Sequence, residues 1–201
     1  MVETFFSQLQ QSSPMELAAV LLAITYLLLA VRENIACWYA AFVSTLIFLF
    51  IFVDVHLYME AALQVYYLGM AVYGWFLWRK KDSSGAELRI TTLTGARHLQ
   101  VLGAIVLLSL LSAWLLDRYT NAVLPLLDSL TTWGAVITTF MVARKILENW
   151  VYWLVIDAVS IYLYLDRGLY FTAGLFCIYI VIIFFGFAAW LRRYRAQTTR
   201  A

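Results

Sequence analysis

The sequence predicts an all-α membrane protein with seven transmembrane helices, arranged as two parallel three-helix repeats around one linker helix (3+1+3). Of the 201 residues, 64% are hydrophobic and only 13% are charged, whereas soluble domains have about 25% charged residues. The apolar residues form long continuous runs, and part of the first half of the chain recurs in the second half. This composition excludes a water-soluble globule. With 17% aromatic residues, it also excludes a disordered chain.

Seven apolar runs approach the length of about 20 residues that a membrane-spanning helix needs. The first run follows Pro14 and ends at Arg32, and no Lys or Arg precedes it, so we expect a retained helix rather than a signal peptide. Stretches such as 46–53 are apolar throughout and lack the alternation of a β-barrel strand. In chain order the expected spans cover residues 15–31, 35–53, 58–78, 98–116, 121–142, 148–165 and 169–190.

The basic residues are divided unevenly between the two sides of the membrane that these spans define. Twelve of the 14 Lys and Arg residues fall on the side of the first, third and fifth interhelical loops and the C-terminus, and only Arg118 and Arg167 fall on the other. Because basic loops are retained in the cytoplasm, we expect the N-terminus outside and the C-terminus in the cytoplasm. These clusters are expected to contact lipid head groups rather than nucleic acid.

An internal repeat emerges when the sequence is compared with itself at the fixed shift that pairs Trp38 with Trp150, which we call the repeat offset. Asp54, Gly74 and Trp78 then pair with Asp166, Gly186 and Trp190. Identical Asp, Gly and Trp residues at one offset indicate a duplication. Three helices and one linker helix shift the second copy by an even number of crossings, so both copies run in the same direction. Parallel repeats are a transporter architecture, with the substrate site between them near the midplane.

The repeat divides the chain into five parts. We expect an N-terminal tail with the first three-helix repeat (1–78), a cytosolic loop (79–97), the linker helix (98–116), the second three-helix repeat (117–190) and a basic cytosolic tail (191–201).

Polar residues inside the expected spans are candidates for a binding site, because ionisable groups are costly in the membrane and normally face the protein interior. They recur at helical spacing, so each set lies on one face of its helix. By span, the sets are Asn34, Trp38 and Thr45 in the second; Glu60, Gln64 and Tyr67 in the third; Asp128, Thr132 and Thr139 in the fifth; and Asn149, Trp150, Trp153, Asp157 and Ser160 in the sixth.

The sixth span predicts a site for a flat organic cation. Asp157 lies about half-way along it, with Trp150 and Trp153 on the same face. A carboxylate supplies the opposite charge, and indole rings supply stacking and cation–π contacts. The amide side chains of Asn149 and Gln64 would then recognise ring substituents or sugar hydroxyls.

Other residues have a structural interpretation. The Thr and Ser residues of the fifth span are as well suited to helix packing as to ligand binding. Four tryptophans are expected to be interfacial anchors: Trp75, Trp78, Trp114 and Trp190. Neither His56 nor His98 has a partner at metal-ligand spacing, and no phosphate-binding or dinucleotide motif occurs. We therefore expect no enzyme activity, no metal and no cofactor.

Three segments resemble PnuC-type nicotinamide riboside transporters. In residues 143–153 a basic pair is followed by Glu148-Asn149-Trp150 and then Trp153, similar to the start of the sixth helix in that family. Residues 60–78 are similar to its third helix, and Leu127-Asp128-Ser129 is similar to the start of its fifth. The resemblance extends over about residues 34–190.

The resemblance implies a fold like that of a full-length SWEET transporter, often assembled as a homotrimer, in the bacterial inner membrane. The implied activity is facilitated diffusion (uniport) of a vitamin precursor, which a cytosolic kinase traps by phosphorylation. The implied substrate contacts are Gln64, Asn149, Trp150, Trp153 and Asp157. From the helical faces described above we add Trp38, Thr45, Tyr67 and Asp128.

Nicotinamide riboside is the first expected substrate and thiamine the alternative. Relatives that carry thiamine have an acidic residue where Asp157 stands, whereas some nicotinamide riboside transporters have an amide. Both molecules are flat cations, so the residues do not separate them. Two other interpretations stay open: a SWEET-like sugar carrier, with which neutral hexoses would compete, and a membrane subunit that does not itself transport.

Overall fold

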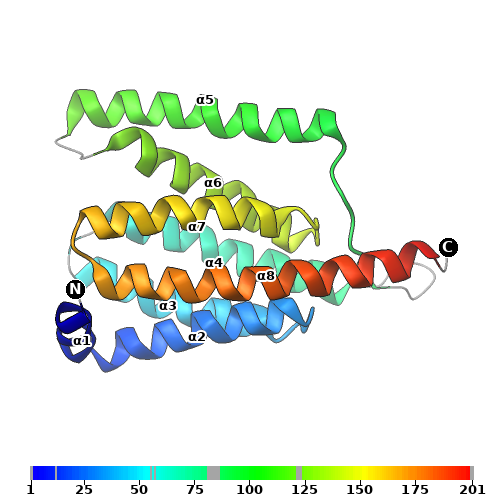
Figure 1. The fold of residues 1–201 in the computed structure, drawn as a ribbon, viewed down its shortest axis with the longest axis horizontal. Helices are drawn as coiled ribbons and strands as arrows, with labels where there is room; N and C mark the ends of the chain where they lie inside the picture. Colours follow the sequence, from blue (N-terminus) through cyan, green and yellow to red (C-terminus); the bar gives the residue numbers. More distant parts are fainter. Residues whose placement is uncertain are drawn as a thin grey trace.

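A computed structural model describes residues 2–11, 13–54, 56, 58–80, 87–120 and 124–199, and within them the chain forms eight helices (Figure 1). Helices α2 to α8 match the seven predicted spans to within a few residues at most ends. The bounds are α1 (Val2–Gln11), α2 (Pro14–Val31), α3 (Cys37–Asp54), α4 (Tyr58–Arg79), α5 (Gly95–Tyr119), α6 (Pro125–Ala143), α7 (Asn149–Asp166) and α8 (Tyr170–Thr199).

Five helices are long and apolar enough to cross a membrane by length and composition: α2, α3, α5, α6 and α8. Helices α4 and α7 fall outside this set. They contain Gln64 and Asp157, and their many Tyr and Trp residues lower the average hydropathy further. The polar character that makes α4 and α7 candidates for a binding site thus also weakens their signature as spans.

Helix ends follow from local chemistry. The Ser13 hydroxyl accepts a hydrogen bond from the Glu16 N–H at 3.1 Å, and Pro14 occupies the first turn of α2, where a missing N–H is harmless. Thr94 caps α5 in the same way. Pro125 begins α6 as Pro14 begins α2. These caps set where each apolar run becomes helical.

Six helices form a closed ring. In order around it they are α2, α3, α4, α6, α7 and α8, and α8 packs back against α2. Helix α5 packs against α6 from outside the ring, and α1 packs against α8 (Figure 1). The ring therefore joins a first bundle, α2 to α4, to a second bundle, α6 to α8, through two contacts: α4 with α6 and α2 with α8.

Helix boundaries in the two bundles recur at the repeat offset. Helices α3 and α7 share both ends at this offset, and α4 and α8 share their first residue. The turns before α3 and α7 also agree, because the N–H groups of Asn34 and Ile146 each donate a 3.0 Å hydrogen bond to a carbonyl five residues earlier. Glu33 and Lys145 adopt left-handed backbone conformations at equivalent places, with φ of 53° and 51°.

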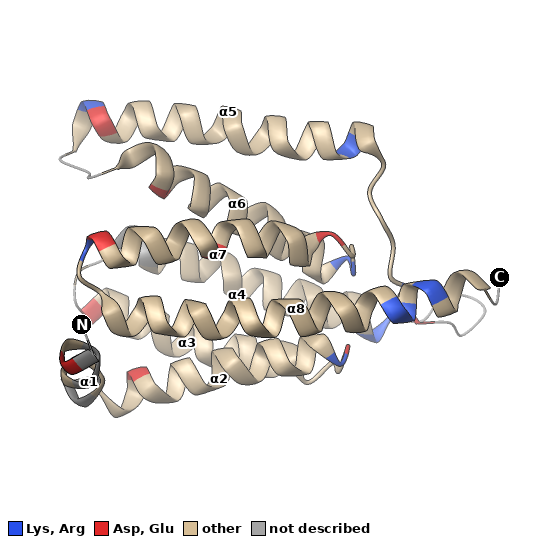
Figure 2. Cartoon of the chain, in the orientation of Figure 1, with Lys and Arg blue, Asp and Glu red and all other residues tan. Residues whose placement is uncertain are grey.

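Charged residues concentrate at the two ends of the helices (Figure 2). We call the end where α2, α4, α6 and α8 terminate and α5 begins the basic end. Among the described residues it carries ten basic side chains, against Arg118 and Arg167 at the opposite end: Arg32, Arg79, Lys80, Arg89, Arg97, Arg144, Lys145, Arg192, Arg193 and Arg195. Lys81 and Arg200 lie outside the described residues, as does the side chain of Glu60.

Three elements go beyond the predicted parts. The predicted N-terminal tail contains α1, which is held to the start of α8 because Gln8 donates to the Gly168 carbonyl at 2.8 Å and accepts from the Phe171 N–H at 3.0 Å. The predicted basic tail, 191–201, is helical as far as Thr199. Helix α5 is longer at both ends than the predicted linker, 98–116.

A row of four tryptophans forms the core of the basic end. Edge-to-face contacts join Trp38 to Trp78 and Trp150 to Trp190, each with ring centroids 5.4 Å apart. Trp78 and Trp190 lie 6.3 Å apart and connect the two pairs. We call this set, Trp38, Trp78, Trp190 and Trp150, the tryptophan row.

The prediction that Trp78 and Trp190 are interfacial anchors is wrong. Their exposed fractions are 7% and 0%. Trp78 Nε1 donates to the Ala143 carbonyl and Trp190 Nε1 to the Ala30 carbonyl, both at 3.0 Å. Since each tryptophan bonds to the other bundle, the two residues join the bundles. Trp114, on the outer helix α5, is 60% exposed, as an anchor requires.

Candidate functional site

Asp157 is buried in the middle of α7. Its exposed fraction is 3%, and its side chain makes no hydrogen bond or ion pair with another described residue. Ser160, one turn further along the same face, is also buried. A carboxyl group in this position is energetically costly unless a positive charge balances its ionised form or a hydrogen-bond partner satisfies its neutral form.

Tyrosines from three helices lie near this level of the ring: Tyr67 of α4, Tyr164 of α7 and Tyr179 of α8. Tyr164 of α7 and Tyr179 of α8 lie close enough to Asp157 to interact with it electrostatically. Tyr67 of α4 lies near Tyr164 and near Tyr26 of α2, whose ring centroid is 6.0 Å from that of Trp38 in the tryptophan row. The interior of the ring at the depth of Asp157 is therefore aromatic and phenolic.

Of these tyrosines, only Tyr67 is among the predicted site residues. Tyr179 stands at the position equivalent to Tyr67 in the second copy, so the repeat could have identified it. Tyr26 and Tyr164 have no such signal, because only the closure of the ring brings α2 and α7 to the same interior.

Three other predicted residues lie at intermediate depth and are partly buried. Trp153 stands one turn from Asp157 on α7 and packs against the core of the basic end. Gln64 precedes Tyr67 by one turn on α4. Thr45 occupies in α3 the position that Asp157 occupies in α7, at the repeat offset. No hydrogen bond of these side chains to another described residue is present, so their polar groups are free to bind a ligand.

Trp38 and Trp150 lie elsewhere, in the tryptophan row. Each is 2% exposed and packs its indole against a glycine of the third helix of its own bundle, Gly74 for Trp38 and Gly186 for Trp150. Both indole N–H groups are buried without a hydrogen-bond acceptor in the described residues. Their packing is that of core residues between helices.

Asn149 begins α7 at the same level. It is fully buried, and its Nδ2 donates to the Ile146 carbonyl at 2.6 Å, while its Oδ1 has no described partner. Asp128, by contrast, lies at the opposite end, where its carboxylate is 43% exposed and 3.5 Å from Arg167 Nη2. The nine predicted residues thus lie at three depths. Trp38, Asn149 and Trp150 lie at the basic end, Asp128 lies at the opposite end, and the other five lie between them.

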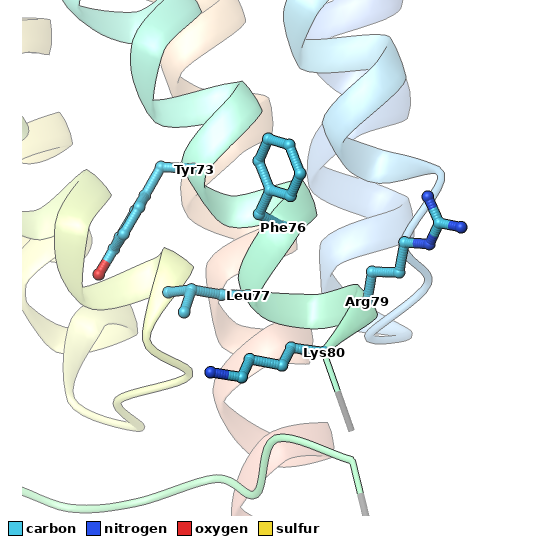
Figure 3. A pocket seen from close by; sticks show the side chains of 5 residues that line it. All are labelled: Tyr73, Phe76, Leu77, Arg79 and Lys80. Carbon is cyan, nitrogen blue, oxygen red and sulfur yellow. The ribbon is translucent and has the colours of Figure 1, made fainter. Parts of the chain in front are cut away.

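A hollow of about 370 Å³ opens on the surface at the basic end of α4 (Figure 3). None of the predicted site residues lines it. Its lining consists of Tyr73, Phe76, Leu77, Arg79 and Lys80.

Comparison with known proteins identifies the family to which this chain belongs. The family model described as nicotinamide mononucleotide transporter matches residues 13–192, which includes all six helices of the ring and the outer helix α5. The chain belongs to this transporter family. The nicotinamide mononucleotide transporter model begins just before α2 and ends within the basic part of α8, so α1 lies outside the matched region.

Two curated relatives of this family are similar over most of their length. The nicotinamide riboside transporter PnuC of Escherichia coli (strain K12) is 25% identical over 198 residues, covering 86% of this chain and 83% of the relative. The riboflavin/roseoflavin transporter RibM of Streptomyces davaonensis is 25% identical over 181 residues, covering 89% and 84%. The relatives are transporters, not enzymes, and their substrates differ.

A solved structure shares the fold. The crystal structure of the vitamin B3 transporter PnuC superimposes with a TM-score of 0.74 at 18% identity, covering 90% of this chain and 82% of that chain. The prediction of an all-helical membrane transporter of the PnuC type is confirmed.

Proposed function

We propose that this chain moves a flat, cationic vitamin precursor across the membrane by facilitated diffusion, with nicotinamide riboside as the first candidate. The observation that carries the proposal is Asp157, a buried carboxyl without a described partner at mid-depth in a member of a vitamin transporter family. A pyridinium ring entering the ring of helices would supply the missing positive charge. The surrounding Tyr67, Tyr164 and Tyr179 would supply aromatic contacts.

The polar groups without partners suit the rest of such a molecule. The Gln64 amide, the Thr45 hydroxyl and the Trp153 ring are partly buried and available in the described structure. Asn149 Oδ1 and Trp150 Nε1, at the start of α7, have no hydrogen-bond partner among the described residues, and in this proposal they reach the ligand when the bundles move. These groups would donate to and accept from a carboxamide and ribose hydroxyls.

The transport pathway in this proposal runs through the closed ring. Helices α2 to α8 each cross the membrane, α4 and α7 included, and the two bundles are parallel repeats linked by α5. Recurrent helix ends and turns at the repeat offset support the duplication. Rocking of one bundle against the other would expose the level of Asp157 to each side in turn.

Orientation and cellular context complete the proposal. The basic end faces the cytoplasm of a bacterium, with the N-terminus outside, because ten described basic residues lie there against two at the opposite end. A cytosolic kinase makes uptake effectively one-way by phosphorylating the substrate. The outward face of α5, which exposes Leu99, Leu107, Leu111 and Trp114, offers an apolar surface for a homotrimer.

Binding calorimetry on the purified chain in detergent tests the substrate. Nicotinamide riboside should bind, and thiamine, riboflavin and a neutral hexose serve as competitors measured in parallel. Stronger binding of thiamine would select the alternative that the Asp157 carboxylate favours, and stronger binding of riboflavin would align the chain with RibM. Binding of the hexose alone would select a sugar carrier.

Uptake into proteoliposomes tests the activity itself. The chain alone should admit the bound vitamin down its gradient, without an ion gradient or ATP. A folded sample that binds none of the four compounds and gives uptake equal to that of empty vesicles would contradict the proposal and favour a non-transporting subunit.

A further inference from the structure

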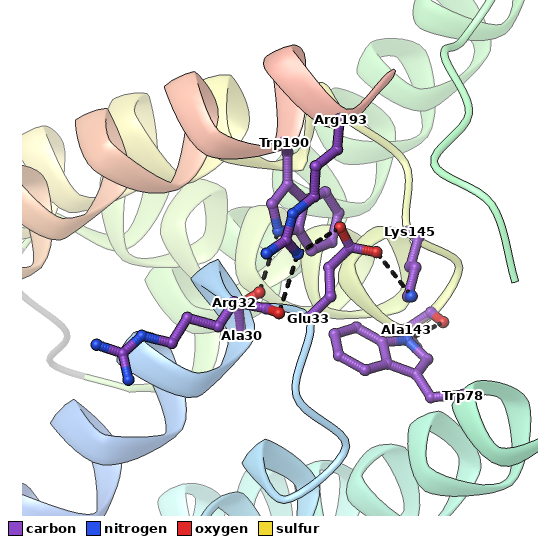
Figure 4. A network of polar contacts seen from close by, with 8 residues as sticks. All are labelled: Ala30, Arg32, Glu33, Trp78, Ala143, Lys145, Trp190 and Arg193. Carbon is purple, nitrogen blue, oxygen red and sulfur yellow. Dashed lines mark hydrogen bonds and ion pairs between the residues drawn. The ribbon is translucent and has the colours of Figure 1, made fainter. Parts of the chain in front are cut away.

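Three charged side chains from separate elements form a network at the basic end (Figure 4). The Glu33 carboxylate, after α2, receives Lys145 Nζ from after α6 at 2.8 Å and Arg193 Nη1 from α8 at 2.8 Å. The Lys145 and Glu33 side chains are only 6% and 12% exposed, whereas that of Arg193 is 46% exposed. Arg193 also donates to the Arg32 carbonyl at 2.9 Å.

The central pair crosses between the two bundles. Glu33 lies two residues after the first helix of the first bundle, and Lys145 lies two residues after the first helix of the second, at positions that the repeat offset makes equivalent. Both have positive φ, a conformation that is uncommon for residues other than glycine. Equivalent residues with the same backbone and opposite charge therefore meet between the two halves of the ring.

The network covers the tryptophan row. Lys145 Nζ lies 4.7 Å from the centroid of the Trp78 ring, a cation–π contact. Beneath it, Trp78 and Trp190 donate to carbonyls of the opposite bundle. The charged and aromatic layers together close the basic end of the ring.

A segment of the loop before α5 bonds to the turn that contains Lys145. Thr91 N–H donates to the Lys145 carbonyl at 3.0 Å, and Leu147 N–H donates to the Thr91 carbonyl at 2.8 Å. Ile90, 3% exposed, belongs to the same buried cluster as the tryptophan row. Glu148 accepts from the Leu93 N–H at 3.1 Å. The turn that presents Lys145 is thereby held in place.

We propose that the Glu33–Lys145 pair, with Arg193, is the latch of the cytoplasmic gate, which opens in each transport cycle to release substrate. This inference rests on the proposed function, because only a transporter needs this end to open. A buried ion pair suits a switch. Its attraction holds the closed state, and water stabilises the separated charges when the bundles part, so the two states differ little in free energy.

Cys37 provides a reporter of opening. It is fully buried in the cluster of the tryptophan row and lies within electrostatic range of Lys145. The chain has two cysteines, so Cys177→Ser leaves Cys37 as the single thiol. Its rate of reaction with a water-soluble maleimide, in folded protein reconstituted into vesicles, reports how often this end opens.

Glu33→Gln should raise the labelling rate of Cys37 about tenfold or more, because it leaves Lys145 as an uncompensated buried charge that only opening can hydrate. The double variant Glu33→Gln with Lys145→Met should label more slowly than Glu33→Gln, since neither charge then remains. Arg193→Gln should give a smaller increase. Arg195→Gln, an exposed basic residue two positions further on α8, should match the parent.

Calorimetry with nicotinamide riboside on the same samples separates the latch from the proposed function. If no sample binds nicotinamide riboside but Glu33→Gln still labels faster, the proposed substrate is contradicted and the latch stays supported. An unchanged rate in Glu33→Gln, an equal increase in Arg195→Gln, or a double variant as reactive as the single one would overturn the latch. If Glu33→Gln does not fold, the absence of any increase in Arg193→Gln overturns it.

Discussion

Asp157 is the residue on which the proposed function depends most. Its side chain is buried without a described ion pair, at a depth where a charge is expensive. In the proposed function a bound cation would compensate that charge. Asp157 would then select for positive charge, and the tyrosines near it would contact a flat ring.

Asp157→Asn should weaken binding of a cationic vitamin about tenfold or more, because interactions with a charged partner are worth about 1.5–3 kcal/mol and about 1.4 kcal/mol corresponds to a factor of ten. Calorimetry measures the change. Asp128→Asn is the matched control, since that carboxylate is 43% exposed at the opposite end, and it should bind as the parent does. Equal affinity in Asp157→Asn would remove charge selection from this residue.

Two glycines make room for two tryptophans. A Cβ atom at Gly186 would lie 2.5 Å from carbons of the Trp150 ring, and one at Gly74 would overlap the Trp38 ring. We expect Gly186→Ala and Gly74→Ala each to destabilise the fold by about 1–3 kcal/mol through overpacking, measured by denaturant titration in micelles.

Gly69→Ala and Gly103→Ala are the controls for this effect. Both glycines are helical, and a Cβ atom at either would meet nothing within 4 Å. Alanine there should be neutral or stabilising by up to about 1 kcal/mol, because it is the better helix former. Destabilisation of all four variants to the same extent would show that space beside the indoles is not the cause.

For individual residues, the sequence predicts the chemical type of a site residue better than it predicts how deep that residue lies in the ring. Helical spacing correctly places Trp153, Asp157 and Ser160 on a largely buried face of α7. The same spacing adds Trp150, although its indole packs on Gly186 in the core. Spacing within one helix determines a face but not what lies opposite, so Tyr26 and Tyr164 could not be predicted before the ring was known.

Helices α4 and α8 each carry a tryptophan that bonds to the opposite bundle at the basic end. Trp78 and Trp190 occupy equivalent places inside the ring and donate to backbone carbonyls of the opposite bundle. The repeat offset reveals their equivalence, but the sequence predicts both as anchors, because Trp near a basic cluster is typical of a membrane interface. The glycine one turn earlier in each helix, Gly74 or Gly186, was the available sign of close packing.

Trp190→Phe and Trp78→Phe should each destabilise the protein by about 1–3 kcal/mol, because each removes an indole donor from a backbone carbonyl of the opposite bundle. Trp78→Phe should cost the more, because the Ala30 carbonyl keeps a 3.0 Å hydrogen bond from the Glu33 N–H when Trp190 is replaced. Trp114→Phe on the exposed face of α5 should leave the free energy of unfolding unchanged. Denaturant titration of the three variants measures these changes. If Trp114→Phe lowered the free energy of unfolding as much as the other two variants, the hydrogen bonds to the opposite bundle would not be the cause.

The elements themselves were largely predictable because lipid imposes length and apolarity on each span. Helix α1 was missed since its ten residues are too few to span, and docking through a polar side chain such as Gln8 leaves no apolar run in the sequence. The turns at Glu33 and Lys145 were missed for another reason: a positive φ in residues other than glycine leaves no mark in composition.

At the scale of the whole molecule, six helices enclose one interior while the charges divide between its ends. Ten described basic residues at one end, against two at the other, predict a single orientation. A fluorescent protein fused to the C-terminus, after the basic part of α8, should therefore fold and fluoresce in the cytoplasm. The same fusion at the N-terminus should be dark, because that end is exported.

Reversal of the charge asymmetry is the control for orientation. Removing Arg32, Arg79 and Lys80 while adding Lys residues next to Arg118 should produce a mixed population in which part of the C-terminal fusion is dark. A bright N-terminal fusion on the parent chain would contradict the proposed orientation and would place the latch on the outer side.

The opposite charges of Glu33 and Lys145 have a consequence for how such a chain could arise. Two identical copies of either bundle, related by the same axis, would bring Glu against Glu or Lys against Lys across the ring. Attraction at this point therefore requires two different halves in fixed partnership, and joining them through α5 guarantees that each half meets its complement. We expect separately expressed halves to assemble with each other and not with themselves.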